Sequence, residues 1–481
     1  MKISEKFKLN KSQYELDFID IDPSVDLPLF IDPYFLAQRT DGWSVEASRT
    51  TRNFFQYLVT LLASGRITKA RTIFRHLNEP NETCLGLSKK EPQGRGIGTT
   101  DTDNIFNSLL ESKAVETGLV EDLEDCRIFV DGIDKDKTSD MTTNIIRKHL
   151  IDYTVQQCNL WNITWTQNVP SGFFWNRQER EWQNIYTQML VIDERKILLV
   201  PKAIASYRSE YTPQKYYRQF ILNYLQHEQL RLDTILVKRR RNEHGDEVAY
   251  VTKKDVKSQF PFSKEFLRKF TEDHPDVFHD FKNVTAERVS PLDDEELGAP
   301  DLTEIIDYLI NQSISIQPGS AFATQYHRLV VGILELLFYP SLVCPQVERE
   351  IHDGRKRIDI TFDNAAHNGF FYRLHTTHKT PAQFIFVECK NYSEDPANPE
   401  LDQLAGRFAL HRGLFGLLLC RTIENMDLFL ARCADTYRDG RGIVLPLVDS
   451  DLMELLNGLK SRQLDAAEGL LAERFRAIAL R

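Results

Sequence analysis

The chain has 481 residues, of which 42% are hydrophobic and 27% are charged, the composition of an ordinary globular protein with room for about two to four domains. Its formal net charge of −10 excludes a protein that coats nucleic acid through bulk positive charge. No apolar stretch is long enough to cross a bilayer, the first residues lack the apolar segment of a signal peptide, and the seven cysteines form no C-x-x-C pair. We therefore expect a cytoplasmic protein with free thiols and no membrane partner.

Residues 1–160 predict an N-terminal module of mixed α+β structure whose role the sequence does not reveal. Alternating apolar residues over 14–22 favour a strand, and an apolar stripe over 44–63 favours an amphipathic helix. A glycine-rich stretch over 86–98 lacks the Gly-Lys-Ser/Thr of a Walker A motif, so we interpret it as a loop. The short apolar run 127–130 predicts another strand.

Residues 161–290 predict a second module of mixed β and α structure, with a recognition or regulatory role. It contains four of the five tryptophans, which we interpret as core or sheet packing, with stacking on bases as the alternative. Residues 291–301 are acidic and contain two prolines, so they predict a linker to a C-terminal domain over 302–481. The strongest basic run of the second module is a candidate contact for nucleic-acid phosphates, and it consists of Lys238, Arg239, Arg240 and Arg241.

The C-terminal domain begins with an apolar helix over 320–339, on which Glu335 is the only carboxylate. Two strands follow, over 354–362 and 384–390, joined by a loop over 363–383. The elements after them are predicted to be a helix over 398–408, a strand over 415–421, a helix over 426–437 and a strand over 442–447.

Polar side chains interrupt the two apolar strands at matching places. Asp359 lies on the first strand, and Glu388 and Lys390 share one face of the second, because strand side chains repeat every two residues. If the strands pair, these three side chains converge, and two buried carboxylates require compensation. A divalent cation such as Mg²⁺ supplies it. Two other Glu-x-Lys triplets, at 111–113 and 194–196, lie in a helical pattern and in a predicted hairpin turn and do not fit this arrangement.

An Asp on one strand followed by Glu-x-Lys on the next resembles the PD-(D/E)xK, or restriction-endonuclease-like, nuclease superfamily, with Ile358 in the place of the Pro of the family name. The resemblance implies an α/β fold in which an αβββαβ core surrounds a central mixed sheet. It also implies that Asp359 and Glu388, with the carbonyl of Cys389, bind Mg²⁺ or Mn²⁺, and that Lys390 orients or activates the attacking water.

The same resemblance suggests roles for residues around this triad. Some members carry a helical Glu that extends the metal site, which Glu335 matches, and a Gln after the lysine strand, which Gln403 matches. Arg407, one turn further along the helix, is a candidate phosphate contact. A basic run beside the proposed metal site is another, and it consists of Arg355, Lys356 and Arg357.

We therefore expect a metal-dependent endonuclease that hydrolyses phosphodiester bonds of DNA. A C-terminal nuclease behind a recognition or regulatory module is similar in layout to bacterial restriction enzymes and anti-phage defence effectors. That likeness implies DNA as the ligand, a homodimer, and partner proteins of a defence system. Two alternatives remain open: a non-catalytic nuclease fold that binds nucleic acid or a partner protein, and a nuclease that acts on RNA.

Overall fold

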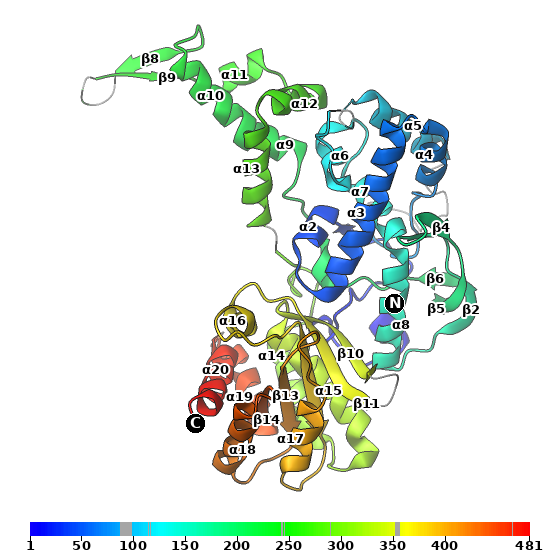
Figure 1. Cartoon of the computed structure of the whole chain (residues 1–481), viewed down its shortest axis with the longest axis vertical. Coiled ribbons are helices and arrows are strands. Elements are labelled where there is room, and N and C mark those ends of the chain that lie inside the picture. The colour runs from blue at the N-terminus through cyan, green and yellow to red at the C-terminus, as the bar shows by residue number, and fades with distance from the viewer. Residues whose placement is uncertain are drawn as a thin grey trace.

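Figure 1 shows the computed structural model of the chain, with a C-terminal sheet domain below an N-terminal helical region and an arm that extends from the top. The structure describes residues 1–481 except 87–98, 114, 116, 242, 243, 245, 289, 352–355 and 464, and it does not describe the side chains of 99–101, 348–351 and 356–358. The predicted glycine-rich loop therefore lies almost entirely outside the described residues. Within the described part of the chain, no helix is both long enough and apolar enough to cross a membrane.

Five strands form one mixed sheet in the C-terminal part, in the order β10-β11-β12-β13-β14. The pairs β10–β11 and β11–β12 are antiparallel, whereas β12, β13 and β14 run parallel. Strands β13 and β14 are buried along their whole length, as expected for parallel strands covered on both faces. The five strands span Leu342–Ile351, Lys356–Asn364, Phe384–Lys390, Phe415–Cys420 and Ile443–Val448.

Helices cover both faces of this sheet, so the prediction of a mixed α/β C-terminal region is confirmed (Figure 1). Helices α15 (Ala323–Phe338) and α19 (Asp449–Lys460) pack on the face that presents Ile360 and Val387. Helices α17 (Asn398–Ala405) and α18 (Met426–Arg438) pack on the face that presents Phe386 and Leu418. The remaining C-terminal helices are α14 (Leu302–Ser315), α16 (Gly369–Thr376) and α20 (Ala466–Ala479).

Five of the C-terminal helices and strands that the structure describes are absent from the sequence prediction: α14, β10, α16, α19 and α20. The predicted loop 363–383 contains α16, and the edge strand β10 was not predicted at all. Strand β10 carries Pro345 next to Cys344, which has a φ of 53°, and its register with β11 shifts between Val343 and Gln346. A proline and a bulge interrupt the alternation that identifies a strand, and both are tolerated at the edge of a sheet.

The N-terminal region is mostly helical. Its longest helix, α3 (Gly42–Ala63), begins where the Asp41 carboxylate caps the backbone N–H of Ser44, and it covers the predicted helix 44–63. The strand predictions for 14–22 and 127–130 are wrong. The first stretch begins with a 3₁₀ turn over Gln13–Glu15, and the second lies mostly in helix α6 (Leu123–Phe129). The other helices of this region are α1 (Ile3–Lys6), α2 (Pro33–Gln38), α4 (Ile67–Phe74), α5 (Thr99–Glu111), α7 (Lys135–Ile145) and α8 (Arg147–Trp161).

Short antiparallel strands follow α8. Trp175 and Trp182 face each other across β3 and β4, and both rings contact Phe54 of α3 edge-on, so these two tryptophans are packing residues. The short strands pair as β2 (Thr166–Pro170) with β5 (Tyr186–Ile192), β5 with β6 (Arg195–Ile197), β3 (Phe174–Asn176) with β4 (Glu181–Gln183), and β1 (Phe30–Ile31) with β7 (Ala205–Ser206).

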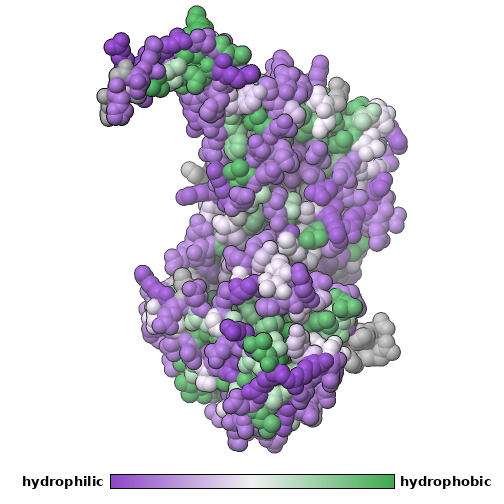
Figure 2. All heavy atoms as spheres, turned by 60° about the vertical axis from the view of Figure 1, so that its left-hand side comes forward, coloured by the Kyte–Doolittle hydropathy of each residue, from purple (hydrophilic) through white to green (hydrophobic). Residues whose placement is uncertain are grey.

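The arm is built from residues of the predicted second module. It ends in the hairpin of β8 (Lys238–Arg241) and β9 (Glu247–Tyr250), and its surface is largely hydrophilic (Figures 1 and 2). Its helical part consists of α9 (Pro213–Lys215), a π-helical turn over Tyr216–Ile221, α10 (Leu222–Arg231), α11 (Lys253–Gln259), α12 (Lys264–Asp273) and α13 (Pro275–Ala286). Hydrophobic side chains are also exposed on the arm, among them Leu232 and Ile235, and Figure 2 shows a hydrophobic patch there.

The hydrophobic cores do not follow the predicted domain boundaries. One core joins buried residues of the N-terminal stretch, such as Leu16 and Leu150, to the C-terminal sheet and to Val331 of α15. A second core combines α3 with residues of the arm as far as Phe281. The predicted linker 291–301 therefore does not separate two independent cores. The backbone N–H of Cys344 on β10 donates to Asp17 across this junction, at 3.0 Å.

Candidate functional site

The proposed site lies where β11 and β12 separate. The last register pair given by the two strands at this end is Ile360 with Val387, and the next residues in register are Asp359 and Glu388. Directly opposite residues of antiparallel strands point to the same face. The Asp359 carboxylate accepts a hydrogen bond from the backbone N–H of Cys389 at 3.1 Å, so the two strand ends are in direct contact. The structure thus brings together the Asp and the Glu-x-Lys segment singled out in the sequence.

Glu388 is fully buried, and basic side chains engage both of its carboxylate oxygens. Lys390 Nζ lies 2.9 Å from Glu388 Oε1 and also donates to Gln403 Oε1 at 2.9 Å. Arg407 donates to Glu388 Oε2. Burial lowers the pKa of Arg407, and the nearby Asp359 carboxylate acts in the opposite direction. Five of the predicted residues, Asp359, Glu388, Lys390, Gln403 and Arg407, therefore lie in one cluster.

The position of Arg407 corrects one step of the sequence argument. We expected a divalent cation to compensate the two carboxylates and Arg407 to contact a phosphate. In the structure, Lys390 and Arg407 already supply two positive charges against Asp359 and Glu388. A cation is therefore not needed to balance the charge of these four side chains, and Arg407 would have to release Glu388 before it could contact a phosphate.

His327 is a member of the site that the sequence analysis missed. Its Nε2 lies 4.0 Å from Asp359 Oδ2, and both side chains are about one fifth exposed. His327 belongs to α15, the helix from which we had selected Glu335. In the sequence, His327 is recognisable only as a single histidine in the first part of an apolar helix. Without the positions of the strands, no observation favoured His327 over Glu335, which lies two turns later, as a site residue.

Glu335 does not lie at this site. It follows His327 by eight residues, which places it about 12 Å further along α15. It is fully buried, neither of its carboxylate oxygens has a hydrogen-bond partner among the described residues, and Lys202 Nζ is 3.9 Å away. Burial raises the pKa of Glu335 well above its usual value, and Asp17 raises it further while Lys202 opposes the shift. The structure therefore does not bring Glu335 together with Asp359 and Glu388.

The predicted phosphate contacts lie in different places. Arg355 is outside the described residues, as are the side chains of Lys356 and Arg357, although the last two belong to β11. The basic run on β8 is exposed on the arm, away from the C-terminal sheet (Figure 1). Two of its members are already ion-paired and a third stacks on a ring: Lys238 with Asp255, Arg239 with Asp233, and Arg240 over Tyr250.

The donor set of the cluster partly suits a metal ion. Asp359 and Glu388 offer carboxylate oxygens and Cys389 a backbone carbonyl, which are the ligands that suit Mg²⁺ or Mn²⁺, whereas the imidazole of His327 suits other transition metals better. Within the described residues, however, no three His, Cys, Asp or Glu side chains are already arranged around a common point that could hold an ion. Burial raises the pKa of the Cys389 thiol well above its usual value, so the thiol stays protonated at neutral pH.

Comparison with known proteins shows a similarity between the N-terminal part of the chain and a protein family. Residues 8–212 match a family described as a domain of unknown function (DUF8370). The match extends beyond the predicted first module and ends where the arm begins. Neither the comparison with curated proteins nor that with solved structures found a match.

Proposed function

We propose that the chain is a metal-dependent endonuclease of the PD-(D/E)xK type that hydrolyses phosphodiester bonds of DNA. The observation that carries this proposal is that Asp359, Glu388 and Lys390 lie close together where β11 and β12 separate. The order of helices and strands around the sheet is compatible with the αβββαβ core that the resemblance implies. The layout supports a role in bacterial defence against foreign DNA, together with partner proteins and a homodimer.

Each side chain of the cluster has a role that follows from its contacts. The carboxylates of Asp359 and Glu388 would hold Mg²⁺ or Mn²⁺, and such an ion activates water and stabilises charge on a phosphate. Lys390, fixed between Glu388 and Gln403, holds an ammonium beside the place where negative charge develops. Gln403 orients Lys390 and is a positioning residue. Arg407 neutralises Glu388 in the free protein and becomes available for a phosphate when a cation takes its place.

A cleavage assay tests this proposal. Supercoiled plasmid, linear duplex, single-stranded DNA and RNA are incubated with the full chain, once with Mg²⁺ or Mn²⁺ and once with chelator. We expect metal-dependent cleavage of DNA that is lost in Asp359→Ala, Glu388→Gln and Lys390→Ala. Glu194→Ala is the matched control, because Glu194-Arg195-Lys196 has the same triplet spacing but Glu194 is exposed in a turn. Undiminished cleavage by Glu388→Gln would refute the assignment.

A second function is favoured by the Arg407–Glu388 ion pair, because a cluster that is neutral without a metal can persist in a protein that only binds nucleic acid or a partner protein. Binding of DNA in chelator, without cleavage under any metal condition, would support this alternative. Cleavage of RNA alone would instead identify a ribonuclease with the same residues.

A further inference from the structure

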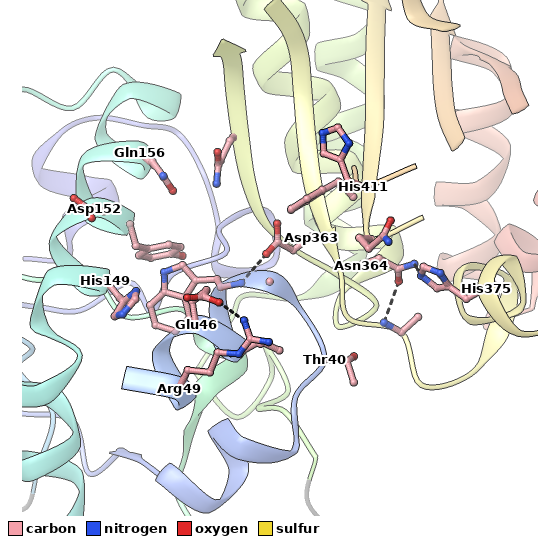
Figure 3. Close-up of a pocket in the computed structure, with 18 of the residues that line it drawn as sticks. Thr40, Glu46, Arg49, His149, Asp152, Gln156, Asp363, Asn364, His375 and His411 are labelled. Atoms are coloured by element: carbon pink, nitrogen blue, oxygen red, sulfur yellow. Dashed lines mark hydrogen bonds and ion pairs between the residues drawn. The ribbon is translucent and has the colours of Figure 1, made fainter. Parts of the chain in front are cut away.

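A cavity of about 1070 Å³ opens between the region matched by the DUF8370 family and the C-terminal sheet (Figure 3). Helices α3 and α8 form one wall. The other wall consists of the ends of β11 and β12 and of α16. The cavity borders Asp363, which lies four residues from Asp359 on β11 and therefore about 14 Å from it along the same face of the strand. It is separate from the candidate metal site, and its volume suits a small organic ligand.

The position of Trp43 in this cavity is fixed from both walls. Its backbone N–H donates to Asp363 Oδ2 at 2.9 Å, which ties the first turn of α3 to the end of β11. Its ring meets His149 and Tyr153 of α8 edge-on, with centroid distances of 6.2 and 6.0 Å. The ring itself is only partly buried. The cavity therefore has a pre-positioned aromatic surface on which a planar ligand can stack.

The charged side chains of the cavity are already engaged. Glu46 pairs with Arg49 at 2.5 Å and with Arg177 at 3.1 Å. Asp152 pairs with Lys148, one turn earlier on α8. Because Glu46 and Asp152 have cationic partners within the protein, the described residues that line the cavity offer neither a free pair of acids for a metal ion nor a cluster of cations for a polyanion.

Three amide side chains of the cavity have unused hydrogen-bonding capacity. Among the described residues, Gln156 of α8, Gln346 of β10 and Gln383, which precedes β12, line the cavity without a side-chain hydrogen bond. Each amide offers both donors and an acceptor. Burial lowers the pKa values of His149 and His375, so these two imidazoles are uncharged at neutral pH. Figure 3 shows Gln156 and His149 extending from α8 opposite Asp363 and Asn364.

From these observations we propose that the cavity binds a nucleobase. A base is planar, neutral and lined with alternating donors and acceptors, so it can stack on Trp43 and hydrogen-bond with amide side chains that come from three separate elements. The base can belong to a free nucleotide or to a nucleic-acid strand that continues toward Asp359. In both cases the ligand contacts the family-matched region and the C-terminal sheet at once. The proposal goes beyond the nuclease assignment, because binding at this place does not require cleavage.

Calorimetric titration of the full chain tests the proposal, in chelator so that no cleavage can occur. The probes are adenosine, guanosine, cytidine and uridine, their 5′-monophosphates, and ten-nucleotide DNA and RNA strands. The variants are Gln156→Ala, Gln346→Ala and Gln383→Ala. Gln56→Ala is the matched control, because Gln56 is exposed on α3 outside the cavity. Circular dichroism of each variant confirms that it is folded.

We expect at least one probe to bind and each of the three cavity variants to weaken it by about tenfold, while the control leaves the affinity unchanged. Binding of a nucleoside or monophosphate would assign the site to a free nucleotide, and glutamine-dependent binding of strands alone would assign it to a base of the nucleic acid. Absence of binding by all probes at millimolar concentration, or binding that none of the three glutamine variants alters, would overturn the proposal. Because cleavage is not measured, failure of the nuclease assignment would leave this result unaffected.

Discussion

The ion pair between Arg407 and Glu388 allows a test of the metal site that does not depend on catalysis. Glu388 is fully buried and Arg407 is 7% exposed, so Arg407→Ala leaves one oxygen of a buried carboxylate without its partner. Removing one member of a buried ion pair costs about 3–5 kcal/mol. Lys390 still engages the other oxygen, so we expect a loss near the lower end of that range, about 3 kcal/mol in the free energy of unfolding.

A divalent cation should restore much of this loss. In the variant, Glu388 and Asp359 no longer have Arg407 as a competitor for an ion, so Mg²⁺ or Mn²⁺ can occupy its place. A ligand at one hundred times its dissociation constant stabilises the folded state by about 2.7 kcal/mol. The wild-type protein should gain less, because the ion must first displace the guanidinium group.

Urea unfolding followed by circular dichroism, with Mn²⁺ or with chelator, measures these differences. Arg438→Ala serves as the control, because Arg438 pairs with Asp435 at 3.4 Å on an exposed part of α18 and its loss should cost less than 1 kcal/mol with or without the ion. If Mn²⁺ stabilises neither Arg407→Ala nor the wild-type protein, the cluster is not a cation site and the metal-dependent mechanism is refuted. Equal stabilisation of both proteins would instead show that Arg407 does not compete with the ion.

Three further predictions concern other parts of the molecule. Because its pKa is raised, Glu335 keeps a proton in the folded state that the unfolded chain releases above about pH 4.5, so the free energy of unfolding should fall as pH rises. In urea titrations above pH 5, the free energy of unfolding of Glu335→Gln should therefore increase relative to that of the wild-type protein by about 1.4 kcal/mol per pH unit. A difference between the two proteins that does not grow with pH would contradict this prediction. Gln403→Ala should slow metal-dependent cleavage about tenfold to hundredfold by releasing Lys390, whereas a rate equal to that of the wild-type protein would exclude a positioning role. Replacing Arg240 and Arg241 together by alanine should reduce the slope of log affinity for duplex DNA against log salt by about 2, and an unchanged slope would show that the hairpin does not contact phosphates.

The sequence predicted the parts of the C-terminal region that obey simple periodicities. Strand β12 has the predicted bounds, β13 and α18 differ from their predictions by one residue at one end, and β14 is shifted by one residue at both ends. The period of two along β11 and β12 put Glu388 and Lys390 on one face of their strand, whereas the pairing that brings Asp359 beside Glu388 was a hypothesis that the register of the two strands bears out. The element bounds and the strand faces are local features, which the periods of 3.6 and 2 of helices and strands determine.

Features that depend on distant parts of the chain could not be predicted in this way. The choice between His327 and Glu335 depends on how far α15 is shifted along the sheet, and helical periodicity does not fix that shift. The pairing of Arg407 with Glu388 joins residues 19 positions apart and depends on the angle of α17 to β12. The run 127–130 was assigned to a strand because a short apolar stretch has no distinctive period, whereas the capping box of Asp122 and Asp125 makes it part of a helix.

The core that crosses the predicted linker has a consequence for how such a chain can change. A fragment beginning at residue 302 would expose the apolar surface of α15 and β10 that Leu16 and Leu150 cover, and it would lose the carboxylate of Asp17 that accepts from Cys344. Such a fragment should aggregate rather than act alone. A gene fusion that joins the C-terminal segment to another protein would therefore also have to include the N-terminal residues that cover α15 and β10. We therefore expect the two segments to be inherited together.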